Sequence, residues 1–337
     1  MWEVIKVSNT TIYDVAGAAK VSLATVSRVM NNPEKVNPET RDKVLRVIKE
    51  LGYRPNAIAR GLASRKTTTV GIVMADVTRA STSQLLGGII DIAKKYEYSI
   101  KIFCIAEGEN VTDALREEIA EQVDGILFLN DELDKAQMDE AMNYIVDSGV
   151  PVVLSNVFTD DERIPYVATD YETATYDITK QLLAQGRDDI YLFSTIRRYS
   201  INSKKEAGYV DAMKEAGLVP KIFRTSGVVD VNKLHFEEFL DSHKISAALS
   251  VRDSIAISFM NVAQSRGLKV PEDVSVVGLQ NTKYAILSSP NLTCVDTPVY
   301  DIGAVSMRLL TKYMKQEEVE TSSILLPYRF VKRQSTM

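Results

Sequence analysis

Two short helices joined by a turn can be read from residues 11–29, and this pair constrains the fold more than any other part of the chain. Thr11 can cap the first helix, and Asp14 three residues later suits the positive end of the helix dipole. The first helix is expected to run to Ala19. Lys20 then stands in the turn, where a positive φ would cost about 1–2 kcal/mol.

A second helix is expected directly after the turn, with Ser22 as its cap. Helical spacing turns Val26 and Val29 toward a core. The residues expected to face outward are Leu23, Ala24, Thr25, Ser27 and Arg28. This arrangement is typical of a helix-turn-helix unit that reads DNA.

A third helix should complete a small all-α head. Asn37 and Pro38 form a cap followed by an N1 proline, and Gly52 is placed to end the helix. Its expected apolar stripe consists of Val44, Leu45 and Ile48. A capped helix pair is also common in helical proteins that bind no DNA. The segment after the third helix helps to distinguish the two interpretations. Asn56 can cap a helix of barely two turns, which is marginal alone.

Together these residues resemble the lactose-repressor (LacI/GalR) family, and the likeness extends along nearly the whole chain. In that family the second helix enters the major groove, and two hinge helices of a dimer pair in the minor groove. The resemblance implies that Leu23, Ala24 and Arg28 face base edges and that Leu62 opens a central base step. It also implies a palindromic operator with a C-G step at its centre.

The chemistry of these side chains agrees with such roles. An arginine fork matches guanine O6 and N7, small apolar side chains contact thymine methyls, and a leucine can unstack a base step. Hydroxyl and amide side chains suit phosphate oxygens, which fix position without reading sequence. The residues assigned to that role are Thr11, Ser22, Thr25, Ser27 and Asn31, and the hinge residues Asn56 and Arg60 complete the DNA-binding set.

Charge divides the chain into two unlike parts. Residues 1–66 contain twelve Lys and Arg against six Asp and Glu, a formal charge of +6. Residues 67–337 contain 28 against 39, a formal charge of -11. A basic head attracts phosphates, whereas an acidic body keeps the remaining surface away from nucleic acid.

From residue 68 onward, short β-branched runs alternate with helical patterns, which predicts parallel βαβ units. The expected fold is a small all-α helix-turn-helix head with a hinge helix, followed by a two-lobed α/β periplasmic-binding-protein-like (Rossmann-like) core. The family resemblance implies three chain crossings, near residues 165, 296 and 326. The expected divisions are 1–55 for the head, 56–66 for the hinge helix and linker, 67–165 plus 297–325 for the first lobe, and 166–296 plus 326–337 for the second.

A ligand site is expected between the lobes, at the carboxyl ends of the strands. Matching strand ends to the effector contacts of the family selects Asp76, Asp170, Lys205, Arg252 and Gln280, and Arg197 joins this set because it follows the strand expected at 190–194. Sugar-binding members usually place Asp at the position of Gln280 and a smaller residue at that of Arg252. With Lys204 nearby, the cleft could be cationic and receive an anion such as a phosphorylated sugar. The alternative is that these cations are solvated or paired with Asp253 and other acids.

A second route of control comes from the branch of the family that carries out catabolite control in Gram-positive bacteria. That branch is switched by a serine-phosphorylated carrier protein (HPr) docking on the first lobe. Arg308 and Lys312, one helical turn apart, could hold the phosphoserine. The matching docking set is Tyr300, Asp301, Arg308, Lys312 and Arg329. A solvated basic helix face is the alternative, and Gly87 stands where the family model has an arginine.

Further expectations concern assembly and location. Residues 332–336 are not a leucine-rich tetramer helix, so the resemblance implies a homodimer. Residues 1–6 lack an apolar signal region and no apolar run could span a bilayer, so a cytoplasmic protein without a membrane partner is expected. Cys104 and Cys294 lie in strand-like runs and are expected to be buried free thiols.

An enzyme is disfavoured, and no cofactor or metal is expected. The only histidines, His235 and His243, lie in a polar helical stretch, and no Walker loop, nucleophile elbow or metal-ligand spacing occurs. The remaining alternative is a sensor for a sugar or sugar phosphate without operator-specific DNA binding. Such a sensor would explain the lobes but not the basic head.

Overall fold

The computed structural model describes residues 10–337 apart from 54–66, 106–108, 121–122, 198 and 322. Side chains of Asn31 and residues 118–120 also lie outside the description. The chain divides into two compact units, Met1–Thr67 and Thr68–Met337, and each is considered by itself.

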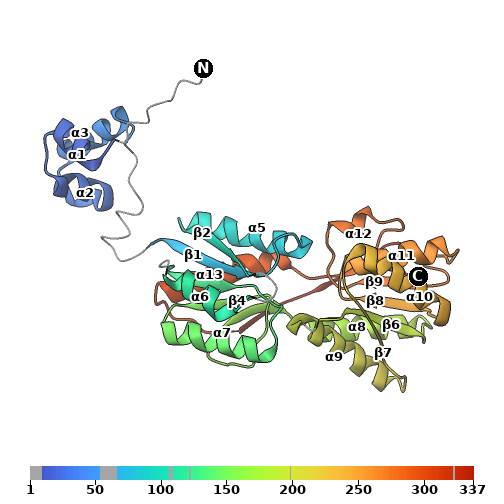
Figure 1. Ribbon diagram of the computed structural model, residues 1–337. Coiled ribbons are helices and arrows are strands. Elements are labelled where there is room, and N and C mark those ends of the chain that lie inside the picture. Colours follow the sequence, from blue (N-terminus) through green and yellow to red (C-terminus); the bar gives the residue numbers. More distant parts are fainter. Residues whose placement is uncertain (1–9, 54–66, 106–108, 121–122, 198, 322) are drawn as a thin grey trace. The chain divides into compact units, whose positions relative to one another are not determined.

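The head consists of three α-helices around a small apolar core (Figure 1). These are α1 (Ile12–Ala19), α2 (Leu23–Asn31) and α3 (Pro38–Glu50), with a short 3-10 helix, η1 (Pro33–Lys35), before α3. The side chains that fill its centre are Val15, Ala19, Val26, Val29 and Val44. The predicted caps are confirmed, because Thr11, Ser22 and Asn37 each accept a hydrogen bond from the backbone of the helix they begin.

Two details of the head refine the sequence analysis. Lys20 adopts the left-handed conformation with φ 51°, so the predicted strain in the turn is present. Leu45 was expected in the apolar stripe of α3 but is 47% exposed. Val47 packs against the core instead, beside Ile48. The expected and the observed apolar stripes share Val44. Positions three and four residues after Val44 lie on its face of the helix, and these are Val47 and Ile48.

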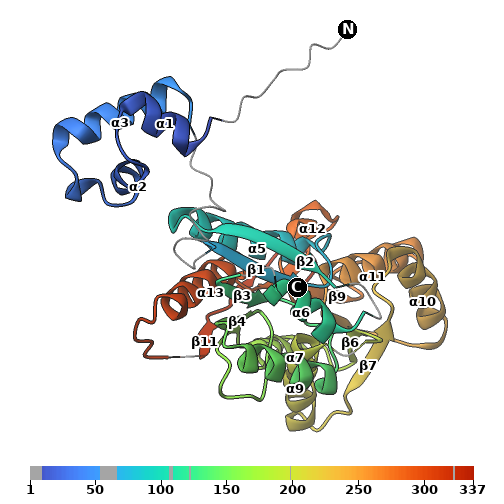
Figure 2. The same ribbon diagram turned by 60° about the vertical axis from the view of Figure 1, so that its left-hand side comes forward.

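The first lobe of the body is a parallel six-stranded sheet of order β11-β5-β4-β3-β1-β2. Its strands are β1 (Thr69–Met74), β2 (Ser99–Cys104), β3 (Gly125–Phe128), β4 (Val152–Ser155), β5 (Tyr166–Thr169) and β11 (Ser323–Leu326). Helices α5 (Ala80–Lys95) and α13 (Val299–Met314) share one apolar cluster with the sheet, and α6 (Val111–Ala120) and α7 (Lys135–Ser148) share another. The lobe therefore has three layers (Figure 2).

Helices α5 and α13 approach each other closely because of two glycines. A Cβ on Gly88 would lie 2.0 Å from the carbonyl oxygen of Tyr300, and one on Gly303 would lie 2.1 Å from that of Leu85. No side chain fits at either position. The close crossing fixes α13 on the sheet and determines which of its faces remains exposed.

The second lobe repeats this architecture, with a six-stranded sheet of order β12-β10-β9-β8-β6-β7. Its strands are β6 (Ile190–Thr195), β7 (Lys221–Thr225), β8 (Ala247–Ser250), β9 (Ser275–Gly278), β10 (Thr293–Asp296) and β12 (Arg329–Val331). Only β12 runs antiparallel to its neighbour. The helices are α8 (Tyr171–Ala184), α9 (Ser200–Glu215), α10 (Val229–Ser242), α11 (Asp253–Ser265) and α12 (Lys283–Leu287).

Two of the expected lobe boundaries differ from the observed sheets. Strand β5, expected to open the second lobe, pairs with β4 and β11 in the first. Leu326, expected in the last strand of the second lobe, pairs with Thr169 in the first. Short apolar runs identify strands, but they carry no record of the sheet that each strand joins. Cys104 also differs from expectation, because it is exposed on edge strand β2, whereas Cys294 is buried.

Candidate DNA-reading helix, interlobe cleft and basic helix face

Helix α2 presents a narrow outward face that the sequence had predicted. Val26 and Val29 are buried in the head. Leu23, Ala24 and Arg28 are exposed on the opposite side, and Leu23 keeps 38% of its surface accessible. A helix with two small or apolar side chains and one guanidinium on its outer face can meet the methyl groups and acceptors of a major groove.

The hydroxyl residues assigned to phosphate contacts lie at the starts of the helices. The hydroxyl of Thr11 donates to the carboxylate of Asp14 at 2.7 Å, and that of Ser22 lies 2.9 Å from the hydroxyl of Thr25. Thr25 and Ser27 are partly exposed on α2. Helix N-termini also carry outward-pointing N–H groups that favour phosphate.

Four further predicted DNA contacts cannot be placed from the structure. Asn31 ends α2, and its side chain is outside the description. Asn56, Arg60 and Leu62 all fall within residues 54–66, outside the described residues. The hinge helix therefore stays a prediction from the sequence.

The body contains a cavity of about 860 Å³ that is lined by both lobes. Five of the six residues predicted for an effector cleft line it: Asp76, Arg197, Lys205, Arg252 and Gln280. Asp170 is not among its lining residues. Its carboxylate instead caps α8, where it accepts hydrogen bonds from the backbone N–H and the hydroxyl of Thr173 at 3.0 and 2.7 Å.

Lys205 is a buried cation at the edge of the cleft, with only 1% of its surface accessible. Its Nζ donates to the carbonyl oxygen of Val251 at 3.0 Å and lies 5.0 Å from the centre of the Tyr171 ring. Burial lowers the pKa of Lys205 to about 7, although the nearby Asp253 acts in the opposite direction. The amine is therefore poised between its charged and neutral forms near neutral pH.

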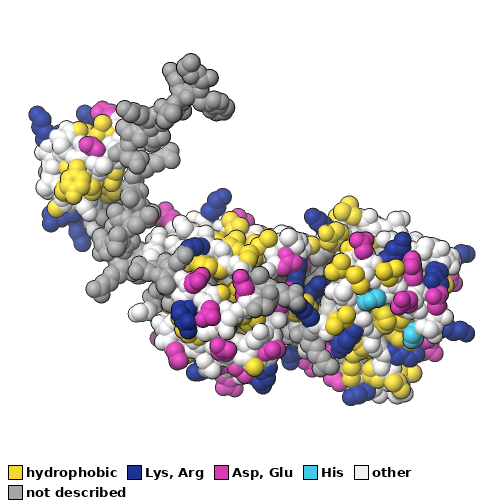
Figure 3. Space-filling view, viewed as in Figure 1, with side chains coloured by type: hydrophobic (Ala, Val, Ile, Leu, Met, Phe, Trp, Pro, Cys, Tyr) yellow, Lys and Arg dark blue, Asp and Glu magenta, His cyan; other side chains and the backbone are white. Residues whose placement is uncertain are grey.

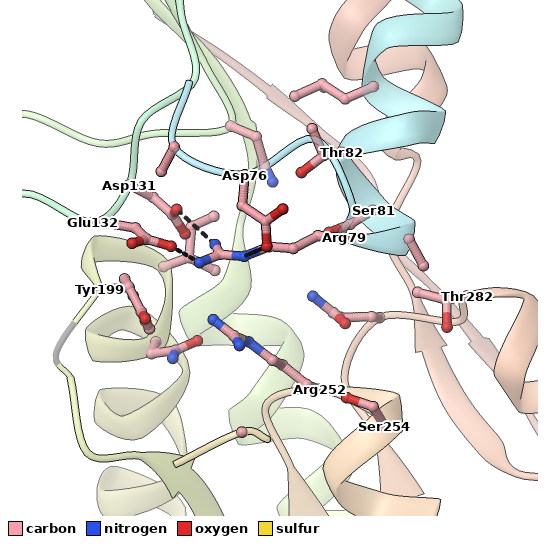
Figure 4. A pocket seen from close by; sticks show the side chains of 18 of the residues that line it. Asp76, Arg79, Ser81, Thr82, Asp131, Glu132, Tyr199, Arg252, Ser254 and Thr282 are labelled. Atoms are coloured by element: carbon pink, nitrogen blue, oxygen red, sulfur yellow. Dashed lines mark hydrogen bonds and ion pairs between the residues drawn. The ribbon is translucent and has the colours of Figure 1, made fainter. Parts of the chain in front are cut away.

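Arg79 was not predicted, yet it is central to the cleft (Figure 4). Its guanidinium pairs with Glu132 and lies 3.2 Å from Asp131 and 3.6 Å from Asp76, all in the first lobe. Residues 79, 131 and 132 stand in loops or at helix starts, where the sequence shows no periodic signal. Only their common position at the ends of neighbouring strands could have indicated them.

Tyr199 connects the cations of the two lobes. The guanidinium carbon of Arg79 lies 5.4 Å from the centre of the Tyr199 ring, and that of Arg252 lies 5.2 Å from it. Arg252 comes from the second lobe and points into the cleft (Figure 4). Such stacking holds guanidinium groups in place while their N–H donors stay available.

The basic residues predicted for the cleft pair with different acidic residues, and one of them lies outside the cleft. Arg197 of the second lobe meets Glu132 of the first lobe at 3.5 Å, which agrees with the pairing alternative. The predicted partner Asp253 is instead buried and accepts hydrogen bonds from Thr282. Lys204 lies outside the cleft and pairs with Glu172 of α8 at 3.2 Å, so it does not add to the charge of the cleft.

One buried hydroxyl in the cleft has an unmet hydrogen-bonding capacity. Ser155, at the end of β4, is fully buried and lines the cavity. Its Oγ has no hydrogen-bond partner among the described residues. A buried hydroxyl of this kind is satisfied by a ligand or a water molecule.

Helix α13 exposes the face predicted for docking a phosphoprotein. Arg308 and Lys312 are exposed one turn apart, and Asp301 lies on the same stripe two turns earlier. Tyr300 is half exposed, and its hydroxyl donates to Asp91 of α5 at 2.6 Å. Arg329 belongs to β12 of the second lobe and pairs with Asp296 at 2.8 Å. Four of the five residues are thus gathered on one helix.

Within the described ranges, no three His, Cys, Asp or Glu side chains come together in a way that could hold a metal ion. No helix among the described residues has the length and apolar character needed to cross a bilayer. Over the face of the body drawn in Figure 3, acidic and basic side chains are interspersed.

Both parts of the chain match known protein families. The model for bacterial regulatory proteins of the lacI family matches residues 11–56, and that for a periplasmic binding protein-like domain matches residues 179–336. Catabolite control protein A of Priestia megaterium is 41% identical, over 97% of this chain and 99% of its own. That of Staphylococcus xylosus is 40% identical, over 97% and 99%.

Solved structures agree with these relatives. The lac repressor dimer bound to operator and the anti-inducer ONPF has a TM-score of 0.89 at 25% identity, covering 98% of this chain and 100% of its own. The chain thus shares the helix-turn-helix head and the two-sheet core of a transcription regulator over nearly its whole length.

Proposed function

The chain belongs to the LacI family of bacterial DNA-binding transcription regulators, and we propose that it acts as a homodimer that reads a palindromic operator to control carbon and sugar metabolism. One observation carries this proposal. Helix α2 is capped by Ser22 and exposes Leu23, Ala24 and Arg28 on one face, while its opposite face is buried. The basic head adds the phosphate attraction that operator binding requires.

Exposed apolar side chains on the first lobe support the dimer. Ile102 on edge strand β2 is 43% exposed, and Ile90 on α5 is 41% exposed. Strand β2 stands at the end of its sheet, so one of its backbone edges has no strand beside it among the described residues. Exposed apolar edges invite association, and a second copy of the chain would cover this one with a two-fold symmetric contact.

We further propose that a sugar or sugar phosphate in the interlobe cleft acts as effector. The cavity offers donors and acceptors from both lobes, including Arg252, Gln280 and the unsatisfied hydroxyl of Ser155. A ligand that touches both lobes binds one lobe arrangement more tightly than another, which is the physical requirement for a shift in population.

Docking of serine-phosphorylated HPr on α13 is the second proposed route of control. Arg308 and Lys312 are exposed, and neither forms an ion pair with a described residue. Two unpaired cations one turn apart can share the oxygens of a phosphoserine. The adjoining Tyr300 and Asp301 would supply the rim of such a contact.

A mobility-shift titration tests the proposed function. Full-length chain is titrated against a panel of palindromes with a central C-G step, at low salt and with excess random competitor DNA. We expect one or a few palindromes to be retarded as a dimer complex. If every palindrome behaves like the competitor, with and without sugar phosphates and phosphorylated HPr, the proposal is wrong.

A further inference from the structure

Glu132 connects two arginines of opposite lobes across the cleft. It lies in the loop between β3 and α7 of the first lobe, and it pairs with Arg79 of the same lobe and with Arg197 of the other. The side chain of Glu132 is 17% exposed, that of Arg79 is 23% exposed and that of Arg197 is 45% exposed. Glu132, Arg79 and Arg197 are called the cross-cleft bridge below.

The two arginines of the bridge form a receptor for an oxyanion. Guanidinium groups match the oxygens of a carboxylate and of a phosphate with the same forked geometry. Tyr199 supports this receptor from one side, because Arg79 stacks over its ring. In this structure the position of the oxyanion is taken by the protein's own carboxylate (Figure 4).

The acidic and basic side chains that line the cavity nearly balance in charge, which agrees with a carboxylate of the protein occupying the oxyanion position. The acidic side chains that line the cavity are Asp76, Asp131 and Glu132, and the basic ones are Arg79, Arg197, Lys205 and Arg252. With all three acids ionised, at most one positive charge is left over. Loss of Glu132 would remove the carboxylate that Arg197 meets at 3.5 Å, while Arg79 would keep Asp131 and Asp76.

We propose that Glu132 is an internal competitor that occupies an oxyanion subsite formed by Arg79 and Arg197, and that a phosphate-bearing ligand gains this subsite only by displacing it. The inference rests on the proposed effector cleft and specifies how that cleft is regulated. In the absence of ligand, the bridge favours the lobe arrangement seen here. An entering phosphate exchanges one anion for another and releases the loop between β3 and α7.

Inorganic phosphate is the probe for this subsite, because it carries the oxyanion without any sugar contacts. Calorimetric titrations compare the full-length parent with Glu132→Gln, which keeps the shape of the side chain and removes its charge. Glu162→Gln is the matched control, since Glu162 is an exposed glutamate of the same lobe that does not line the cavity. The double variant Glu132→Gln/Arg197→Gln tests whether Arg197 contributes to the phosphate subsite.

We expect Glu132→Gln to bind phosphate about fivefold or more tightly than the parent, because a half-buried competing charge has been removed. Glu162→Gln should match the parent, and the double variant should lose the gain. Equal binding by the parent and Glu132→Gln would overturn the proposal. A gain that survives in the double variant would overturn it too, because phosphate would then bind elsewhere.

Hydrogen exchange provides a readout of the bridge without any ligand. Amides at the start of α9, residues 200–205, follow Arg197 and should exchange faster in Glu132→Gln than in Glu162→Gln. Unchanged exchange would contradict a role in holding the lobes. Neither measurement uses DNA, so a failure of operator binding in the mobility shift is distinguishable from a failure of this inference.

Discussion

The hydroxyl of Tyr171 donates a 2.7 Å hydrogen bond to Oδ1 of Asn156, and this bond joins the two lobes at the wall of the cleft. Tyr171 is the first residue of α8 in the second lobe, and Asn156 follows β4 in the first. The same ring lies below Nζ of Lys205. The buried Tyr171 side chain therefore contacts both Lys205 in the cleft and Asn156 of the first lobe.

Tyr171→Phe should destabilise the body by about 1–2 kcal/mol, because the partly buried amide of Asn156 loses its donor. Urea unfolding of the full chain measures the loss. Tyr176→Phe is the control, since the hydroxyl of Tyr176 meets Glu215 on the exposed side of α8 and α9. Equal effects of the two substitutions would show that the interlobe bond contributes nothing particular.

Lys20→Gly should stabilise the head by about 1 kcal/mol, since Lys20 has a φ of 51° that is costly for a residue with a Cβ. Hydrogen exchange of the α1 and α2 amides in the full chain reports the change. Lys20→Ala removes the same charge but keeps the Cβ, so it should bring no gain. A comparable gain in the alanine variant would attribute the effect to charge.

Arg28→Ala should lose about 1–3 kcal/mol of discrimination between an operator and a scrambled palindrome. The weak binding that depends on salt should remain, because other basic residues of the head still attract phosphates. Competition mobility shifts at two salt concentrations measure both quantities. Arg41→Ala, on α3 beside Asp42, should preserve discrimination, and an unchanged ratio for Arg28→Ala would refute base reading.

Arg308→Ala should weaken the binding of serine-phosphorylated HPr by about tenfold or more, because one charge-assisted contact to the phosphoserine is lost. Calorimetry with phosphorylated and unphosphorylated HPr gives the comparison. Arg116→Ala serves as control, since Arg116 is an exposed arginine on α6 that pairs with Asp113. Docking on α13 is excluded if the two variants bind alike.

Lys205 makes the stability of the body depend on pH. Burial lowers its pKa from 10.5 to about 7 in the folded chain, so between these values the unfolded chain binds more protons and stability rises with pH. Lys205→Met should remove this part of the rise. Urea unfolding at pH 7 and pH 9 tests it, and an identical pH dependence in parent and variant would contradict the assignment.

The local elements were largely predictable from neighbouring residues. Caps at Thr11, Ser22 and Asn37 act over three or four residues, so sequence spacing is sufficient to find them. The same holds for the buried face of α2 and for the alternation of strands and helices in the body, which the sequence patterns predicted. The resemblance to the LacI family, which the relatives confirm, supplied the overall architecture.

Other features depend on which segments meet in space. Strand β5 was placed in the wrong lobe, because its own residues do not show that it pairs with β4 and with the distant β11. Asp170 was expected in the cleft but caps its own helix. Local hydrogen bonds compete with a ligand for the same carboxylate, and only the folded geometry shows which one prevails.

Periodicity and capping thus suffice for the helices, the strands and the exposed face of α2, because they arise from contacts within a few residues. The cross-cleft bridge has no such signature. Glu132 and Arg197 are 65 positions apart and lie in irregular segments, so their meeting follows from the way two separate sheets set their strand ends against each other. Long-range packing alone brings these charges together, and with them the oxyanion subsite proposed for the cleft.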